Sequence, residues 1–381
     1  YRLMALNMQT GAVRWETQES VFGSFLAYSK GHDKLIQSTR PSKDTVRDET
    51  GKRMIAYDGS DGTIAWDVER NYGTFPVLHN DWLITKGEFA SIETGLPITR
   101  KNPLTGEAEA WTWARNYGCN YPIASENLLT FRSAAAGFYD LANEGGTGNF
   151  GGFKSSCTSN LVVADGVMNA PDYTRTCNCS YQNQTSLALV HMPEIELWTF
   201  NTLDMGENNV TRVGINFGAP GDRMADSGTL WIDYPNVGGP SPEIEITLNP
   251  DAKPFRNHTS RILGGDLPWV AASGLEDCRE VSIRLNKTPV EGKTYTVRLL
   301  FAEPTKASTG DRVFDVSLQG QPVLEAFDVT KEAAGPWRSI VKEVKGVAIT
   351  DVLKIGLSPV EGSADMPPIL SGVEIILEEA A

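Results

Sequence analysis

The sequence predicts an all-β protein made of a partial β-propeller followed by a β-sandwich of the jelly-roll type. Three observations predict it. Gly (36) and Pro (21) are both abundant in the 381 residues, which favours short strands joined by turns. A segment that reads as a hairpin ending in Trp recurs in the first half of the chain. Apolar and polar residues alternate with a period of two in the second half.

Composition limits the class of protein before any motif is considered. Apolar residues make up 40% of the chain and charged residues 22%, which is the composition of a folded protein. The formal net charge is −14, so the basic field that nucleic acids or anionic membranes require is lacking. No apolar run approaches the ~18–20 residues of a membrane-spanning helix. We therefore expect no nucleic-acid partner and no membrane span.

The first half contains an internal repeat. Arg2–Glu16 and Arg53–Asp67 align without gaps, and Trp15 and Trp66 occupy the same place in the two copies. Each copy reads as an apolar strand, a polar turn that ends in Gly, and a second strand closed by Trp. Weaker copies of the pattern are Phe89–Ile98 and Pro103–Trp111. Several strands in a period of about 40–50 residues are typical of a propeller blade.

This repeat resembles that of the quinoprotein (PQQ-type) β-propeller family, in which the Trp packs between neighbouring blades. A propeller closes with about four to eight blades, and residues 1–205 offer about three or four. We therefore expect only the C-terminal blades here, with the missing blades upstream or on another chain. Residues 116–200 resemble the last blades of long, exported propeller proteins of planctomycete type.

The cysteines are unevenly placed. Cys119, Cys157, Cys177 and Cys179 fall in one region, whereas Cys278 stands alone. In an exported protein, the first four predict two disulfides, whose connectivity the sequence leaves open. Pairing of Cys177 and Cys179 with Cys119 and Cys157 is favoured, because a direct bond between Cys177 and Cys179 would close a very tight ring.

The second half, residues 206–381, has the pattern of an antiparallel β-sandwich. Alternation is plain in Tyr295–Phe301 and in Arg312–Leu318. We predict turns that join strands at Gln319-Gly320 and at Lys345-Gly346, and in the first half at Asp165-Gly166.

Five motifs in order give this half a resemblance to the malectin family: Ile215–Gly218, Asp226-x-Gly228-x-x-Trp231, Phe301–Glu303, Arg312–Val316 and Ile369–Ile375. The resemblance implies a jelly-roll-like β-sandwich that often binds carbohydrate. It covers nearly all of residues 211–378.

Candidate carbohydrate-binding residues follow from this resemblance and from the chemistry of sugars, whose C–H faces stack on aromatic rings while carboxylates accept their hydroxyl hydrogens. Asp365 matches the Asp of the family's last loop. The family carries aromatic residues after Phe-Ala-Glu, where this chain has Pro304–Lys306. The other candidates are Trp231, Tyr234, Trp269 and Trp337, which lie in loop-like contexts. The alternative is that these aromatic residues pack against the other domain or at the rim of the sandwich.

The predicted function is that of a non-catalytic, exported binding or scaffold protein, extracellular or periplasmic, that recognises carbohydrate or a partner in a bacterial cell envelope. A structural interaction module without sugar binding is an open alternative. Glu303, Asp311 and Asp315 lie close together in sequence, but Asp315 falls in a framework motif, so we assign no catalytic residue. No cofactor is predicted. The alternative function is a PQQ- and calcium-dependent dehydrogenase whose catalytic blades lie upstream.

Overall fold

The computed structural model describes residues 1–39, 52–70, 72–154, 161–171, 186–190, 192, 196–360 and 366–378. The chain divides into two compact units, which are described separately below. Unit 1 comprises residues 1–100, 108–142 and 149–191, and unit 2 comprises residues 101–107, 143–148 and 192–381. The predicted boundary at residue 205 stays a prediction.

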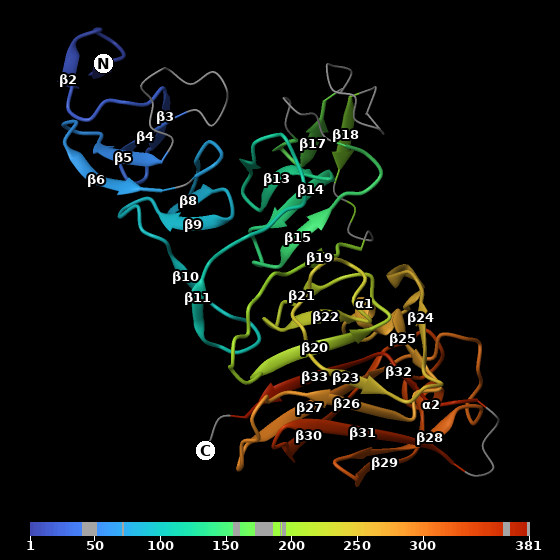
Figure 1. Ribbon diagram of the computed structural model, residues 1–381. Helices are drawn as coiled ribbons and strands as arrows, with labels where there is room; N and C mark the ends of the chain where they lie inside the picture. The colour runs from blue at the N-terminus through green and yellow to red at the C-terminus, as the bar shows by residue number, and fades with distance from the viewer. Residues whose placement is uncertain are drawn as a thin grey trace. The chain divides into compact units, whose positions relative to one another are not determined.

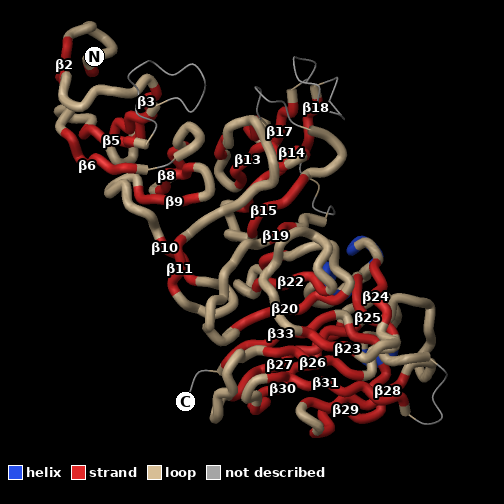
Figure 2. Tube along the Cα trace, viewed as in Figure 1, coloured by secondary structure: helices blue, strands red, loops and turns tan. Residues whose placement is uncertain are grey.

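Strands dominate both units, as Figure 2 shows. Among the described residues the helices are limited to three short segments: η1 (Thr259–Arg261), α1 (Pro268–Ala271) and α2 (Val329–Glu332). The all-β prediction is therefore confirmed.

The strands of unit 1 form small antiparallel sheets in chain order. The bounds of its strands are β1 (Leu3–Leu6), β2 (Val13–Thr17), β3 (Phe25–Ser29), β4 (Lys34–Ser38), β5 (Arg53–Asp58), β6 (Ile64–Glu69), β7 (Val77–His79), β8 (Trp82–Thr85), β9 (Glu88–Ser91), β10 (Thr99–Lys101), β11 (Ala108–Ala110), β12 (Ile123–Ala124), β13 (Leu128–Ser133), β14 (Ala135–Asp140), β16 (Val162–Ala164), β17 (Val167–Ala170) and β18 (Leu187–Val190). The sheets are β1-β2, β3-β4-β5-β6, β7-β8-β9, the β12-β13-β14 strands, and β16-β17-β18 (Figure 1).

Four turns of one type close the hairpins of the repeat. Each begins with an Asn, Asp or Ser whose side-chain oxygen accepts a backbone N–H two or three residues later, which is the Asx or Ser turn that these residues favour. Each ends in a Gly with φ between +69° and +78°, whose N–H donates back to the first residue. The turns are Asn7–Gly11, Asp58–Gly62, Ser91–Gly95 and Asn102–Gly106. The structure thus contains the repeated hairpin turns expected from the sequence.

The two repeat tryptophans pack on the next turn along the chain. Trp15 Nε1 donates to the carbonyl oxygen of Gly59 at 2.9 Å, and Trp66 Nε1 donates to that of Ile92 at 2.9 Å. A Cβ added at Gly62 would lie 2.5 Å from the Trp15 ring, and one at Gly95 would lie 2.8 Å from the Trp66 ring. Only glycine therefore fits under either indole.

Small apolar cores separate successive sheets of unit 1. One contains Ile36, Met54 and Trp66 of β3–β6 together with Leu83 and Ala90 of β7–β9. Another joins Ile84 and Phe89 to Phe131 and Tyr139 of the following strands. The sheets thus pack face to face in chain order, and none of the sheets formed by the described strands closes on itself. The quinoprotein-type propeller stays a prediction.

Unit 2 is a sandwich of two main sheets with a third, smaller one. Its strands are β15 (Gly146–Asn149), whose last residue lies in unit 1, β19 (Thr199–Phe200), β20 (Arg212–Phe217), β21 (Arg223–Met224), β22 (Leu230–Tyr234), β23 (Ile246–Leu248), β24 (Lys253–Arg256), β25 (Ser273–Glu276), β26 (Glu280–Arg284), β27 (Thr294–Phe301), β28 (Val313–Leu318), β29 (Gln321–Asp328), β30 (Ile340–Ala348), β31 (Val352–Pro359), β32 (Ile369–Leu370) and β33 (Gly372–Leu377). The sheet orders are β21-β22-β20-β33-β27-β30, β23-β26-β31-β28-β29 and β24-β25-β32.

One apolar core fills the space between the two main sheets. It combines residues of the first sheet, such as Ile215 and Val373, with residues of the second, such as Val316 and Ile355. Leu104 is also a member of this core and is fully buried. It lies in the turn between β10 and β11, and its carbonyl oxygen accepts the N–H of Thr211 at 2.7 Å.

The turn predictions had mixed outcomes. Gln319-Gly320 joins β28 to β29 and Asp165-Gly166 joins β16 to β17, both with positive φ at the two turn residues, so these predictions are confirmed. The predicted turn at Lys345-Gly346 was wrong. These two residues lie within β30, where the pairing with β27 shifts register at a β-bulge.

The prediction that the sandwich is antiparallel also needs a correction. β20 and β22 pair in parallel, with Gly214 opposite Trp231, because β21 and the loop between them return the chain to the same direction. The other strand pairs described in the main sheets are antiparallel.

The packing of Trp66 on Gly95 predicts that Gly95→Ala destabilises the chain more than Gly11→Ala. Both glycines occupy the same turn position with nearly the same φ, but a Cβ at Gly11 meets nothing within 4 Å. Both variants incur the strain of the left-handed conformation, about 1–2 kcal/mol. Only Gly95→Ala adds overpacking, about 1–3 kcal/mol. Urea unfolding of the two variants measures the difference, and equal losses would contradict the packing.

Candidate functional site

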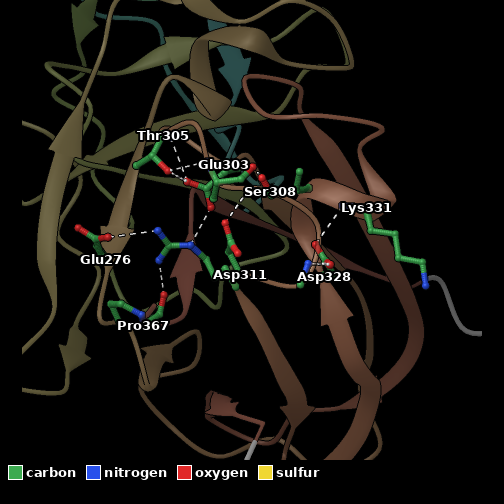
Figure 3. Close-up of polar contacts among 12 residues, drawn as sticks. Glu276, Glu303, Thr305, Ser308, Asp311, Asp328, Lys331 and Pro367 are labelled. Atoms are coloured by element: carbon green, nitrogen blue, oxygen red, sulfur yellow. Dashed lines mark hydrogen bonds and ion pairs between the residues drawn. The ribbon is translucent and has the colours of Figure 1, made fainter. Parts of the chain in front are cut away.

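Loops from different sheets of unit 2 meet at one end of the sandwich around a buried arginine. The residues concerned are Glu276 at the end of β25, Glu303 after β27, Thr305, Arg312 before β28, and Pro367 before β32. We call this group the rim cluster, and Figure 3 shows Glu276, Glu303, Thr305 and Pro367 close together.

Arg312 uses each of its nitrogens to join a different segment. Its Nε donates to Glu303 Oε2 at 2.7 Å, its Nη2 donates to Glu276 Oε1 at 3.2 Å, and its Nη1 donates to the carbonyl oxygen of Pro367. The side chain of Arg312 is 1% exposed and that of Glu303 is 0% exposed. A guanidinium suits such a place because its donors have fixed directions and it stays charged.

Glu303 is fully engaged. Its second oxygen, Oε1, accepts the backbone N–H of Thr305 at 3.0 Å and the Thr305 hydroxyl at 2.6 Å. Both carboxylate oxygens therefore hold the loop in place. A carboxylate buried and bonded in this way is poorly suited to exchange a proton with a substrate.

The neighbouring carboxylates also serve the backbone. Asp311 Oδ2 accepts the N–H of Ser308 at 2.7 Å, and Asp328 accepts the N–H groups of Gly310 and Lys331, the latter as the N-cap of α2. Asp315 Oδ1 accepts the N–H of Ala326 at 2.7 Å. Glu303, Asp311 and Asp315 are therefore held by separate structural hydrogen bonds rather than arranged as a catalytic pair.

Trp337, one of the predicted carbohydrate-binding aromatic residues, lies beside this cluster. Its backbone N–H donates to the carbonyl oxygen of Glu303 at 2.9 Å, which fixes its position relative to the rim. The residue is half-buried, and the Arg261 guanidinium lies over its ring at 4.5 Å from the centroid. An aromatic ring with a cation beside it can contact both the C–H face and the hydroxyls of a sugar.

Trp231 lies elsewhere, on the face of the β20–β33 sheet opposite the core. It is 0% exposed, and its indole lies against Gly214 and Gly372, where an added Cβ would come within 2.1 Å and 2.9 Å of the ring. Trp269 packs edge-on against it, with centroids 5.8 Å apart and planes at 86°. Because Trp231 is sealed from solvent, its ring acts in packing and offers no face to a sugar here.

The remaining candidates are dispersed. Tyr234 is half-buried, packs beside Phe217, and donates its hydroxyl to the carbonyl oxygen of Ile246 at 3.1 Å. Asp365 lies outside the described residues. Of the predicted set the structure thus brings Trp231 and Trp269 together, and places Trp337 at the rim.

The cysteine prediction needs a correction at one residue. Cys119 is free and exposed, with its Sγ 3.2 Å from the Tyr117 hydroxyl, so the predicted disulfide at this position is not formed. Cys157, Cys177 and Cys179 lie outside the described residues. Cys278 is free, as expected, and burial raises the pKa of its thiol to about 12.

Asp222 and Asp233 form a buried carboxylate pair that the sequence did not predict. Asp222 accepts hydrogen bonds from Ser241 Oγ at 2.6 Å and Asn201 Nδ2 at 3.1 Å, and it lies beside Asp233. Burial, opposed by these hydrogen bonds and assisted by the charge of Asp233, raises the pKa of Asp222 to about 7. No motif marks the pair, because its partners come from separate loops.

The residues that the structure describes contain no group of three or more His, Cys, Asp or Glu side chains placed to hold a metal ion. They also contain no helix long and apolar enough to cross a bilayer. The expectation about quinone and calcium is not tested by these findings.

Comparison with known proteins supports part of the expected family relationship. Residues 286–369 match the family model "Malectin domain", which covers β27 to β31 and the rim loops between them. A segment of the chain is 28% identical over 115 residues to a probable leucine-rich-repeat receptor-like serine/threonine-protein kinase of Arabidopsis thaliana. That match covers 29% of this chain and 11% of the kinase, so the chain spans about a tenth of that relative's length.

Solved structures that partly match this chain include the extracellular domain of ANXUR2 from Arabidopsis thaliana, at 15% identity and a TM-score of 0.36, covering 51% of this chain and 58% of that one. Another is the Bacteroides uniformis beta-glucuronidase, at 18% identity and a TM-score of 0.34, covering 44% of this chain and 18% of that one.

The buried ion pair predicts that Arg312→Met costs about 3–5 kcal/mol of unfolding free energy, because Glu303 is left charged and buried. Urea unfolding measures the loss. In the control, Arg284→Met removes an arginine whose ion pairs with Glu245 and Asp351 are partly exposed, and we expect a far smaller change. The double variant Arg312→Met/Glu303→Met should recover most of the loss. Equal effects of the two single variants would contradict the role of the pair.

The raised pKa of Asp222 predicts a pH-dependent difference between the wild type and Asp222→Asn. The folded state holds the Asp222 proton up to about pH 7, whereas the unfolded chain releases it near the ordinary aspartate pKa of 3.8. The stability that this proton supplies is therefore complete below pH 3.8 and is lost as the pH rises to about 7. Relative to Asp222→Asn, the wild type should lose up to about 1.4 kcal/mol per pH unit in that window. Urea unfolding at pH 5 and pH 8 tests this, and a difference independent of pH would contradict it.

Proposed function

We propose that this chain is a non-catalytic binding protein that recognises carbohydrate through the rim of unit 2. The observation that carries the proposal is the division of roles at the rim. The carboxylates of Glu303, Asp311 and Asp328 are engaged in holding loops, while Trp337 and Arg261 stay accessible beside them. Such a site can contact a ligand, and its most deeply buried carboxylate, that of Glu303, has both oxygens bonded to the chain itself.

The charge and polarity of the rim support a hydroxyl-bearing ligand. Glu276 is partly exposed and uses one oxygen for Arg312, so its other oxygen can accept a hydroxyl hydrogen. Thr305, Lys306 and Thr309 are exposed on the adjacent loop. The malectin match covers the loop that carries Thr305, Lys306 and Thr309 and supports a binding role.

We place the protein outside the cytoplasm, in contact with glycan or protein of a cell envelope, with unit 1 as blades of a propeller scaffold. The packed order of the sheets of unit 1 and the tryptophan that joins each repeat to the next turn support the scaffold. A protein partner at the rim is the other occupant that the test below distinguishes.

The test is a glycan array probed with the whole chain, followed by titration calorimetry with any glycan that is retained. Trp337→Ala should weaken binding at least about tenfold, which is a loss of about 1.4 kcal/mol. Tyr234→Phe serves as the control, because it removes only the hydrogen bond to Ile246 and should leave the affinity unchanged.

Three results would contradict the proposal. One is an array without a retained glycan, which would favour a protein partner. Another is that Trp337→Ala leaves the binding of every retained glycan intact. The third is turnover of a bound oligosaccharide, detected as smaller products by chromatography.

A further inference from the structure

A groove of about 750 Å³ opens on unit 2, and none of its lining residues belongs to the rim cluster. It lies on the face of the β21-β22-β20-β33-β27-β30 sheet opposite the core, and its walls include β21 and the segment before α1. The alternation of the strands sets this face. Val297, Leu299 and Phe301 of β27 point into the core, so Arg298 and Leu300 point into the groove.

One wall of the groove is a charged row across three strands. Arg298 pairs in register with Glu374 on one side and Glu343 on the other. Its Nε donates to Glu343 Oε2 at 2.7 Å, and its Nη1 donates to Glu374 Oε2 at 3.0 Å. Glu374 is also held by the hydroxyl of Thr229. The row is therefore fixed before any ligand arrives, and Arg298 Nη2 is left as a donor.

The next row is apolar. Leu300 lies opposite Val341 on β30 and Gly372 on β33, and α1 covers the far end of the row through Val270 and Trp269. Trp269, Leu300 and Val341 all line the groove. A flat apolar strip beside a polar row is the surface that a sugar ring, with C–H groups on its faces and hydroxyls at its edge, can cover.

The opposite wall holds polar groups with unused hydrogen-bonding capacity. The Arg223 guanidinium stacks on Trp269 at 4.8 Å from the ring centroid and makes no hydrogen bond or ion pair with any residue that the structure describes. The carboxylates of Asp226 and Asp266 are exposed, and they accept no hydrogen bond from the described part of the chain. Donors and acceptors thus face the groove together.

The charges of the lining decide between ligand classes. The groove presents two arginines, Arg223 and Arg298, and four carboxylates, those of Asp226, Asp266, Glu343 and Glu374. The carboxylates outnumber the arginines and would repel an anionic ligand. The ammonium groups of a cationic ligand are donors alone, so they would leave the two guanidiniums without an acceptor. A neutral polyhydroxylated ligand avoids both costs, because each hydroxyl can donate to a carboxylate and accept from a guanidinium.

We propose that this groove is a second binding site, specific for a neutral oligosaccharide that lies over Leu300 and Val341 and bonds to Arg223, Asp266 and the Arg298 row. The site does not depend on the rim. It shares no residue with the rim cluster, so either site can be present without the other.

The experiment titrates the whole chain with neutral tetrasaccharides of glucose, mannose and xylose, and with tetragalacturonate and tetraglucosamine as charged probes. Tryptophan fluorescence reports binding, because Trp269 lines the groove. We expect at least one neutral tetrasaccharide to bind at least about tenfold more tightly than both charged probes. Hydrogen exchange with that sugar should show added protection in β27 and β30.

Variants then place the site. Arg223→Gln and Asp266→Asn should each weaken the neutral tetrasaccharide at least about tenfold, while Trp337→Ala at the rim leaves its affinity unchanged. Asp266 is exposed, so its variant should keep the fold even if Arg223→Gln does not. The proposal is overturned if no neutral tetrasaccharide binds at about 1 mM, if a charged probe binds best, or if only Trp337→Ala weakens binding. The last result would leave the rim proposal standing alone.

Discussion

Arg312 and Glu303 form an ion pair with almost no access to water, and the loops at one end of unit 2 are arranged around it. Arg312 lies just before β28, and its guanidinium bonds to Glu276 at the end of β25, Glu303 after β27 and Pro367 before β32. These strands belong to the two main sheets and to the smaller third sheet. Taking two charges out of water is costly, and their attraction repays this only when the remaining polar atoms are bonded. Thr305 and Pro367 supply those bonds, so the pair fixes the course of the loops rather than merely adding stability.

Successive side chains of each strand point to opposite faces of the first main sheet of unit 2, so the two faces carry different sets of residues. One face supplies half of the core. On the other, Gly214 and Gly372 leave room for Trp231 to lie flat, and the Glu374–Arg298–Glu343 row stands beside it. The apolar cluster of Trp231, Trp269 and Leu300 lies on this face, and Trp269 and Leu300 also line the groove. A proposed binding surface thus arises from residues that also stabilise the sheet.

The sequence predicted the local features of the fold well. Gln319-Gly320 and Asp165-Gly166 are two-residue turns because their side chains and φ values permit little else. The four turns of the repeat follow from one Asn, Asp or Ser and one Gly at fixed spacing. Lys345-Gly346 carries the same signal, but the pairing partner of β30 continues past it, and that is a tertiary property.

The long-range features could not be predicted. Trp231 reads as a loop residue, and its burial depends on two glycines far from it in sequence that leave space for the indole. Leu104 reads as part of the repeat in the first half, yet it completes the core of unit 2. At the candidate site, Glu303 and Arg312 lie in two separate malectin-like motifs, and nothing in the sequence indicates that they form an ion pair. Arg223 and Asp266 carried no motif at all, because the groove is assembled from five separate segments of unit 2.

The most direct test of the central claim is amide hydrogen exchange of the wild type and Arg312→Met under native conditions. If the buried pair orders the rim, the N–H groups of Thr305, Ser308 and Gly310 should exchange much faster in the variant, while those in β20 and β33 keep their protection. Unchanged protection at the rim, or an equal loss across the whole sandwich, would contradict the account.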